Sequence, residues 1–381
     1  MSGRRGHGWR LRGGRLVVGL VLAAMACAPG TVAPATKPAP APGQPPAAQP
    51  PAAAQAQPPA PTAAPAPVQL KYGTQRPVTD AAIFIADAKG YFKEAGVEMD
   101  FVDFGSATEM LPALATGQLD MGGTTPVAAV VNAIARGVDV KTVAERGANV
   151  PGFGYTALML RKDLINSGRV KDYPDLRGLQ FGVGAPLKAA GGSTELLAVL
   201  EKGGLQWDDV NATALSFPDM DAALANGALD AIIVAEPWAS HEVAAGYGVR
   251  WKGMDEVYPN HMLAGLAYSP VMTRDRPDVA RNWMVAYVRG VRWYLDAVTK
   301  GQGKDELYSI IAQYSTMKDR AVLERMTLHG VKPDPYVDRA SVVRDLAAYR
   351  RWGTVTEQVD IEQLIDDQWV RYAVEKLGPY R

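Results

Sequence analysis

MLPALATGQLDMG occupies Met110–Gly122, and a near copy, MDAALANGALDAI, occupies Met220–Ile232. Seven of the thirteen positions are identical in register: Met, Ala-Leu-Ala, Gly, Leu and Asp. In each copy a helical pattern ends at a glycine, a short apolar strand follows, and a polar loop, GGTTP or AEPW, comes next. Chance agreement between common residues is the alternative. We interpret the two copies as the same helix–Gly–strand unit in each of two lobes.

Strand-like and helix-like segments alternate on both sides of the repeat. VQLKYGT at 68–74 and VEMDFVDF at 97–104 have strand patterns, with a helical pattern between them. A second alternating series begins near Leu176. This order predicts an α/β fold of two lobes, with mostly parallel sheets flanked by helices. Ligands of open α/β sheets bind outside the carboxyl ends of the strands, so the sequence predicts a ligand cleft between the lobes.

Capping residues predict where several helices begin and end. Ser106 is the N-cap of a capping box, and its helix is expected to end before Gly117. Thr125 is expected to cap the next helix, because a proline follows it at the first helical position. In the second series, a helix is expected to begin at Gly192 or Ser193.

The two strand patterns at 154–162 and 262–274 are expected to carry the chain between the lobes. Lobe 1 then spans 68–158, lobe 2 is an insertion at 159–262, and 263–381 returns to lobe 1 and ends in helices. Four large side chains recur at helical spacing in this last part and are expected to pack in the core rather than to hold a cofactor: Trp283, Tyr287, Val291 and Tyr294.

The first 67 residues are expected to lie outside the fold. Residues 1–27 have the basic start and apolar run of a signal peptide, and the run is too short to span a membrane comfortably. The run ends at Cys27, as in a bacterial lipobox whose cysteine is lipidated; an ordinary cleaved signal is the alternative. Residues 28–67 are mostly Pro and Ala and are expected to be a disordered linker. The sequence therefore predicts an exported protein, either anchored to the outer face of the cell membrane or periplasmic.

Composition excludes several other classes of protein. The net charge of zero argues against nucleic acid as a partner, because phosphate binding needs a basic surface. The single cysteine permits no intrachain disulfide and no cysteine-based zinc cluster. The four histidines show no metal-ligand spacing and are expected in the leader, at the surface or in packing: His7, His241, His261 and His329. We expect no metal, no cofactor and no ATP-binding loop in a monomeric chain.

Three stretches together resemble the solute-binding proteins of the nitrate/sulfonate/taurine and thiamine-pyrimidine-precursor type. They read AKGYFKEAGVEMDFVDF…ALATGQLDMGGTTP, DLRGLQFGV and ALANGALDAIIVAEPW, within residues 68 to 300. The resemblance implies a two-lobed periplasmic-binding-protein fold that closes by a hinge over a small-molecule solute. It also implies partners, the permease and ATPase subunits of an ABC importer, and no catalysis by this chain.

Polar residues at three expected helix starts are candidate ligand contacts, since such positions bind anions and carbonyl groups. They are Ser106, Thr108, Thr124, Thr125, Ser193 and Thr194. Hydroxyl groups that merely cap their own helices are the alternative.

The loop Glu236-Pro237-Trp238 is the sharpest local candidate for the site. The Glu236 carboxylate would accept hydrogen bonds from a ligand amine or ring N–H, and Trp238 would stack on a flat ligand. A hinge ion pair for the glutamate and a wedge between lobes for the tryptophan are the alternatives. Four further candidates are Thr74, Gln75, Tyr155 and Lys188.

The sequence leaves the solute and two rival functions open. A sulfonate would use the helix starts and a cationic partner, whereas a pyrimidine or other heterocycle would use Glu236, Trp238 and Tyr155. The first rival is an enzyme of the same fold, but the relatives that are a desulfinase and pyrimidine synthases depend on cysteine, and Cys27 lies in the leader. The second rival is a ligand-sensing or scaffold module. We expect a solute-binding protein with a partly aromatic organic ligand.

Overall fold

The computed structural model describes residues 66–381. The chain divides into two units, Met1–Thr62 and Ala63–Arg381, and the described residues all belong to the second. The expected signal peptide, the expected lipidation site Cys27 and nearly all of the expected linker lie outside the described residues. Within the described part, no helix has both the length and the apolar composition needed to cross a bilayer.

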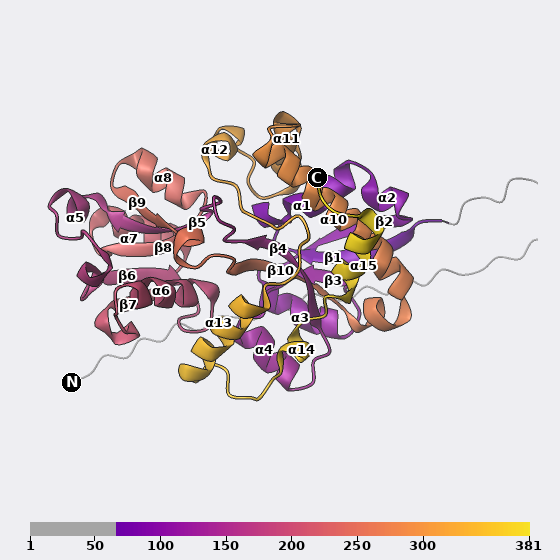
Figure 1. The fold of residues 1–381 in the computed structure, drawn as a ribbon, viewed down its shortest axis with the longest axis horizontal. Coiled ribbons are helices and arrows are strands. Elements are labelled where there is room, and N and C mark those ends of the chain that lie inside the picture. Colours follow the sequence, from indigo (N-terminus) through magenta and orange to yellow (C-terminus); the bar gives the residue numbers. More distant parts are fainter. Residues whose placement is uncertain (1–65) are drawn as a thin grey trace, which may run out of the picture. The chain divides into compact units, whose positions relative to one another are not determined.

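Two five-stranded sheets form the two lobes, at the right and left of Figure 1. The first sheet has the order β2-β1-β3-β10-β4, with β1 (Val68–Thr74), β2 (Val97–Asp103), β3 (Met121–Gly123), β4 (Lys141–Ala148) and β10 (Met262–Tyr268). The second has the order β7-β6-β8-β5-β9, with β5 (Thr156–Arg161), β6 (Gln180–Gly184), β7 (Asn211–Leu215), β8 (Ala231–Ala235) and β9 (Gly248–Gly253). The predicted two-lobed α/β fold is confirmed.

Each sheet mixes parallel and antiparallel pairing. β1 pairs in parallel with β2 and β3, and β6 pairs in parallel with β7 and β8. The antiparallel pairs are made by β10 with β3 and β4, and by β5 with β8 and β9. The parallel part therefore comes from the repeated units, and the antiparallel part from the two strands that follow a crossing between lobes.

The crossings lie slightly earlier in the chain than the sequence suggested. β5 belongs to the second sheet along its whole length, and β10 belongs to the first sheet from Met262 onward. The chain therefore crosses through 149–155 and 259–261, and the expected divisions at 158 and 262 fall inside strands. A strand's alternating pattern does not reveal which sheet it joins, so this correction could not be read from the sequence.

The duplicated stretches occupy equivalent places in the two lobes. α3 (Ala107–Ala115) precedes β3 and α7 (Phe217–Asn226) precedes β8, and each of these strands is the third in its sheet. Gly117 and Gly227 both follow the helix with a positive φ, of 71° and 81°, which glycine adopts without strain. The repeat thus encodes one structural unit used twice.

The repeated aspartates make equivalent hydrogen bonds in both copies. Asp120 Oδ2 accepts a hydrogen bond from Lys71 N at 2.8 Å, and Asp230 Oδ2 accepts one from Gln180 N at 3.0 Å. Each aspartate backbone N–H also donates to the carbonyl of that same neighbouring residue. A carboxylate bonded to a backbone N–H makes a strong, oriented contact. The conserved spacing from glycine to aspartate therefore sets the register of the neighbouring strand in each sheet.

The first strand of each unit carries a glycine against the repeated methionine. A β-carbon on Gly73 would lie 2.6 Å from Leu119 Cδ1, and one on Gly182 would lie 2.7 Å from Leu229 Cδ1. Met110 and Met220 are fully buried beside these glycines. The helix of each unit therefore packs closely on its strands only because the strand has no side chain there.

Helices cover both faces of each sheet. The remaining helices of the first lobe are α1 (Ala81–Ala88), α2 (Tyr91–Glu94), α4 (Ala128–Ala135), α10 (Pro277–Thr299), α11 (Lys304–Tyr314), α12 (Arg320–Arg325), α14 (Ile361–Leu364) and α15 (Gln368–Leu377). Those of the second lobe are α5 (Lys162–Asn166), α6 (Gly191–Lys202), α8 (Trp238–Ala245) and α9 (Met254–Val257). The expected helix start at Thr125 is wrong: α4 begins at Ala128 after the N-cap Val127.

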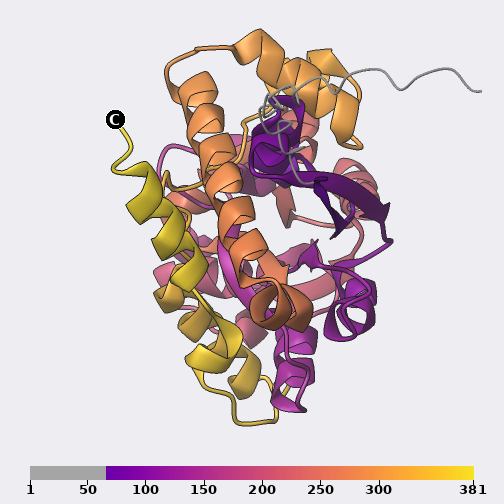
Figure 2. The same cartoon turned by 90° about the vertical axis from the view of Figure 1, so that its right-hand side faces the viewer.

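The long helix α10 forms the core of the first lobe, alongside α15 in Figure 2. Its predicted stripe is confirmed, because Trp283, Tyr287, Val291 and Tyr294 are all fully buried. Trp283 stacks on Phe92 with ring centroids 5.1 Å apart. These side chains belong to the main apolar cluster of the first lobe.

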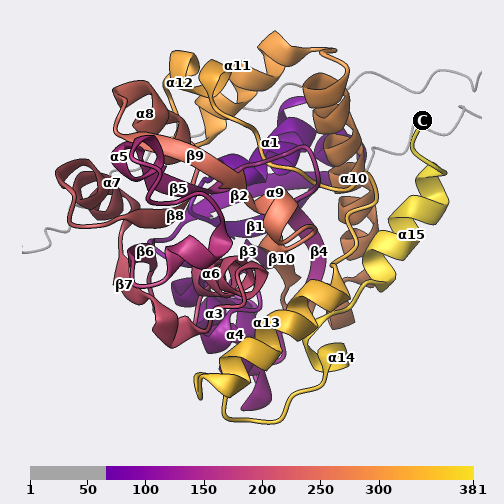
Figure 3. The same ribbon diagram turned by 60° about the vertical axis from the view of Figure 1, so that its left-hand side comes forward.

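The helix α13 (Arg339–Arg351) lies against both lobes, as Figure 3 shows beside α6, α3 and α4. Toward the second lobe, Arg344 Nη2 pairs with Glu201 Oε2 of α6 at 2.6 Å. Toward the first, Leu346 and Tyr349 pack in one apolar cluster with Val131 of α4. The C-terminal helix α13 thus contacts both lobes and closes one side of the space between them.

Candidate ligand-binding cavity

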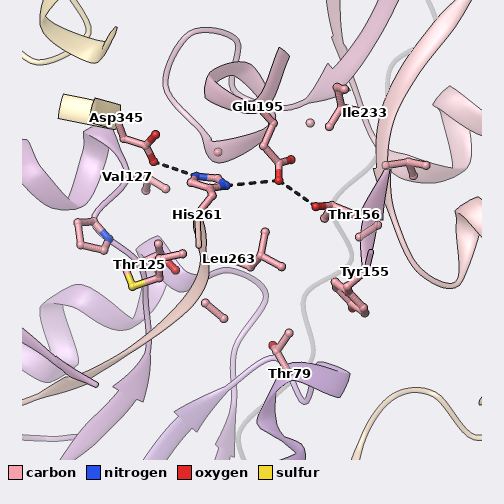
Figure 4. A pocket seen from close by; sticks show the side chains of 18 of the residues that line it. Thr79, Thr125, Val127, Tyr155, Thr156, Glu195, Ile233, His261, Leu263 and Asp345 are labelled. Atoms are coloured by element: carbon pink, nitrogen blue, oxygen red, sulfur yellow. Dashed lines mark hydrogen bonds and ion pairs between the residues drawn. The ribbon is translucent and has the colours of Figure 1, made fainter. Parts of the chain in front are cut away.

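A cavity of about 270 Å³ lies where the strand ends of the two lobes face each other. Figure 4 shows its wall from close by. The first lobe contributes Thr79 and Thr125 to the wall, and the second lobe contributes Glu195, Phe217 and Ile233. The crossing segments contribute Tyr155 and His261, and α13 contributes Val342, Asp345 and Tyr349. Most of the wall is apolar with a few convergent polar groups, which is typical of a small-molecule site.

The polar part of the wall centres on His261, which is 1% exposed. Its Nδ1 lies 3.3 Å from Glu195 Oε1 and its Nε2 lies 3.0 Å from Asp345 Oδ2. Figure 4 shows the imidazole between the two carboxylates. The ring also stacks on Tyr258, with centroids 4.4 Å apart. A histidine that faces a carboxylate at each nitrogen donates at both, so the ring carries a positive charge.

The protonation of His261 follows from a balance of two effects. Burial alone would lower its pKa, because a charged ring is poorly solvated inside the protein. The charges and hydrogen bonds of Asp345 and Glu195 outweigh this effect and raise the pKa to about 10. His261 is therefore an imidazolium at neutral pH and ties together residues from α6, a crossing segment and α13.

Glu195 is held in place by donors from the first crossing. Asn149 Nδ2 donates to Glu195 Oε1 at 2.8 Å, and the Thr156 hydroxyl lies 2.9 Å from the same oxygen. Thr156 also lies 2.8 Å from Asn149 Oδ1. Asn149, Thr156 and Glu195 are all buried. This network fixes the orientation of the carboxylate before any ligand binds.

No lysine or arginine lines the cavity within residues 66–381. Two arginines near its walls are already paired with acids: Arg146 bonds Asp80 beneath the first lobe's strand ends, and Arg250 bonds Glu236 in the second lobe. No group of residues in the described range has the arrangement of a metal site.

The structure brings two of the predicted ligand contacts to the cavity, Thr125 and Tyr155. Thr125 Oγ1 accepts a hydrogen bond from Gly265 N at 3.2 Å, so its hydroxyl also joins the loop to β10. Tyr155 packs edge-on against His329. The predicted start of α6 also reaches the cavity, but through Gly191 and Gly192 rather than through hydroxyl groups.

The hydroxyls at the start of α6 bond to the backbone. Ser193 Oγ accepts from Lys188 N at 2.9 Å, and Thr194 Oγ1 donates to Gly191 O at 3.0 Å. The Lys188 ammonium lies over the ring of Trp207, 5.4 Å from its centroid. Ser193 and Thr194 thus have the local role that was their alternative interpretation, and Lys188 contacts an aromatic ring rather than the cavity.

Five candidates of the first lobe also do not line the cavity. Thr74 bonds the buried Asp80, and Gln75 donates to the Gly105 carbonyl. Ser106 caps α3 by accepting from Glu109 N, as expected. Thr108 is exposed on α3, and Thr124 is buried, with no partner for its hydroxyl in the described part of the chain.

Glu236 and Trp238 lie beside the cavity wall rather than in it. The Glu236 carboxylate pairs with Arg250 and accepts from Ser240 and from Thr327 N, which belongs to the first lobe. Trp238 lines a separate groove with Met317 and other residues of the α11–α12 region. The glutamate thus forms the ion pair that was the alternative interpretation, and it also contacts the other lobe.

Sequence reasoning missed the most polar part of the site. His261 was expected at the surface or in packing, yet it is buried between two acids. Glu195 lies one turn into a helix whose start was predicted, and its nearness to that start was the sequence signal that could have identified it. Asp345 lies 84 residues from His261, so no local pattern joins them.

Comparisons with known proteins agree on the fold. The NMT1-like family model matches residues 63–312. No curated protein matches the sequence significantly. The periplasmic aliphatic sulphonate binding protein SsuA from Escherichia coli has a TM-score of 0.62 at 20% identity, covering 80% of this chain and 93% of that chain. The periplasmic nitrate-binding protein NrtA from Synechocystis PCC 6803 has a TM-score of 0.62 at 15% identity, covering 82% of this chain and 90% of that chain. The desulfurization enzyme DszB has a TM-score of 0.55 at 18% identity, covering 82% of this chain and 100% of that chain.

Proposed function

The chain belongs to the NMT1-like family, and we propose that it is an extracytoplasmic solute-binding protein that delivers a small organic solute to an ABC importer. The observation that carries this proposal is the mostly apolar cavity between the strand ends of the two lobes. Both lobes, both crossings and α13 supply its wall, so a molecule in the cavity contacts both lobes at once.

Closure over the solute follows from that geometry. Two short segments, 149–155 and 259–261, join the lobes and would bend as a hinge. A solute that contacts both walls binds the closed arrangement more tightly than an open one, and this difference is what shifts the population. The permease and ATPase subunits of the importer are the proposed partners that receive the solute from a monomeric binding protein.

The N-terminal part of the sequence supports export and anchoring. We take residues 1–27 as the signal peptide, Cys27 as the lipidation site, and 28–67 as a spacer. Forty Pro/Ala-rich residues reach up to about 120 Å when extended at roughly 3.1 Å per residue. The binding unit would thereby reach a permease while tethered to the outer face of the membrane.

Within the cavity, Thr125 and Tyr155 remain our proposed contacts from the sequence, and Glu195 and His261 join them. The wall favours an organic solute without an anionic group over a sulfonate, because no lysine or arginine of the described residues lines it. The aromatic rings of Tyr155, Phe217 and Tyr349 offer flat surfaces for a heterocycle.

A thermal-shift screen of the purified protein tests the proposal. The panel contains sulfonates, nitrate, bicarbonate, pyrimidines, flavins and small organic amines. A solute at a hundred times its dissociation constant stabilises the folded protein by about 2.7 kcal/mol, which gives a readily measured shift. A dose-dependent shift with one chemical class supports a binding protein; a folded, ligand-free protein that responds to none of them contradicts it.

Two other functions are compatible with this fold. An enzyme of this fold has a structural precedent in DszB, but at 18% identity that likeness extends to the fold alone. We propose no catalytic role, since the chain's single cysteine is Cys27 and the cysteine chemistry expected of such relatives has no residue in the folded unit. A sensor or scaffold protein would use the same cavity to bind its ligand. If the protein binds a solute but does not support its import together with the importer's other subunits, a sensor or scaffold role is favoured.

A further inference from the structure

One oxygen of the Glu195 carboxylate has no partner in the wall of the cavity. Glu195 is 3% exposed. Its Oε1 accepts from Asn149 Nδ2 at 2.8 Å and lies 2.9 Å from the Thr156 hydroxyl and 3.3 Å from His261 Nδ1. Within residues 66–381 no group donates to Oε2, and Figure 4 shows this oxygen directed away from both Thr156 and His261.

The other acid of the cluster is fully used. Asp345 Oδ1 accepts from the Tyr258 hydroxyl at 2.9 Å, and its Oδ2 faces His261 Nε2 at 3.0 Å. Glu195 Oε2 has no donor among residues 66–381, and it is not one of the side-chain oxygens that the fold cuts off from solvent, so it is open to the cavity. Glu195 Oε2 is therefore the acceptor that a bound solute would satisfy.

The charge of the cluster has the same implication. Two carboxylates, Glu195 and Asp345, face one imidazolium, His261, so the sum is −2 + 1 = −1. The nearby Arg146 and Arg250 are each paired with an acid of their own and add no net charge. A cavity with a net negative charge favours a cation.

The rest of the wall suits the apolar body of such a molecule. Tyr155, Phe217 and Tyr349 present aromatic rings, and Ile233 and Val342 present aliphatic groups. Aromatic faces attract cations as well as flat rings. One feature opposes this preference: the first turn of α6 lines the cavity through Gly191 and Gly192, and helix starts attract anions.

We propose that the solute is a small organic cation, and that a protonated nitrogen of it donates to Glu195 Oε2. The inference rests on the proposed function and deepens it by naming the class of solute. Glu195 is the specificity-determining residue, and its orientation is fixed beforehand by Asn149, Thr156 and His261. Preorganisation of this kind raises affinity, because the carboxylate loses little freedom when the solute binds.

Three probes of nearly the same shape test the charge preference in the unaltered protein. They are benzamidine, which is a cation, benzamide, which is neutral, and benzoate, which is an anion. Calorimetric titration gives the dissociation constant of each. A charge-assisted hydrogen bond to Glu195 predicts that benzamidine binds about ten- to a hundredfold more tightly than benzamide. Benzoate is expected to bind most weakly.

A matched pair of variants on α6 assigns the preference to one residue. Glu195→Gln keeps the shape and removes the charge, and it is expected to weaken benzamidine by about tenfold or more while changing benzamide by less than about threefold. Glu201→Gln is the control, because Glu201 is half exposed on the outer side of the helix and pairs with Arg344. It is expected to leave all three affinities unchanged.

The results separate this inference from the proposed function. Benzoate binding as tightly as benzamidine, no binding of benzamidine, or an unchanged benzamidine affinity in Glu195→Gln would overturn the inference. A sulfonate or nitrate that stabilises the protein in the thermal-shift screen would leave the proposed function standing and still overturn it. If Glu195→Gln fails to fold, the ranking of the three probes in the unaltered protein decides the question alone.

Discussion

Replacing His261 by glutamine is expected to remove a large part of the pH dependence of folding stability between pH 6.5 and about 9. The paired carboxylates of Asp345 and Glu195 outweigh burial and raise the pKa of His261 to about 10, from 6.5. A pKa raised by folding means that the folded protein binds the proton more tightly than the unfolded chain. This stabilisation is fully present below pH 6.5 and is lost as the pH rises toward 10.

The magnitude follows from the size of the shift. Each pKa unit corresponds to about 1.4 kcal/mol, and His261 is almost completely buried, so solvent screening is small. The linked stabilisation is about 4 kcal/mol at pH 6.5 and about 1 kcal/mol at pH 9. The contribution of His261 therefore falls by about 3 kcal/mol across this window.

Urea unfolding followed by circular dichroism at several pH values measures this loss. Glu145 and Glu242 also titrate in the window, since burial raises the pKa of each to about 8. The effect of Glu242 cancels between the wild type and His261→Gln, whereas the pKa of Glu145 is expected to rise further in the variant, because the charge of His261 lowers it. His329→Gln is the control, because burial lowers the pKa of His329 to about 3 and places its titration outside the window. Equal pH slopes in the wild type and His261→Gln would refute the charged His261 and its two partners.

Three further predictions follow from the repeated units and the cavity. Gly73→Ala is expected to destabilise the protein by about 1–3 kcal/mol in thermal unfolding, because its β-carbon would lie 2.6 Å from a leucine methyl, whereas Gly184→Ala, with its nearest atom at 4.0 Å, should change little. Asp120→Asn and Asp230→Asn should each cost about 1–2 kcal/mol, and very different costs would contradict their equivalent roles. Trp238→Ala should change solute affinity by less than about twofold, since Trp238 lines a separate groove; a tenfold loss would return it to the site.

The fold could be predicted largely because its signals are local and occur twice. The glycine after each helix and the aspartate after each glycine are short-range features, and both copies have the same role in the structure. The signal at Thr125 was misleading for a local reason. Thr125 and the following proline match the pattern of a helix start, but the Thr125 hydroxyl bonds β10 and α4 begins three residues later.

The polar centre of the candidate site could not be predicted in the same way. Glu195, His261 and Asp345 come from a helix, a crossing segment and the C-terminal part of the chain. Asp345 reaches His261 because α13 packs against both lobes. Tyr155 was found because a strand pattern and an aromatic residue coincided at an expected crossing. Glu236 was predicted to contact the ligand because it is an acid in a distinctive loop. Its carboxylate instead pairs with Arg250 of the next strand, β9.

A crystal structure of the protein with the solute that shifts its melting temperature most would test the central claim directly. We expect the solute in the cavity between the lobes, in contact with Tyr155 and with a nitrogen at hydrogen-bond distance from Glu195 Oε2. A solute found in the groove beside Trp238, or elsewhere on the surface with the cavity empty, would contradict it.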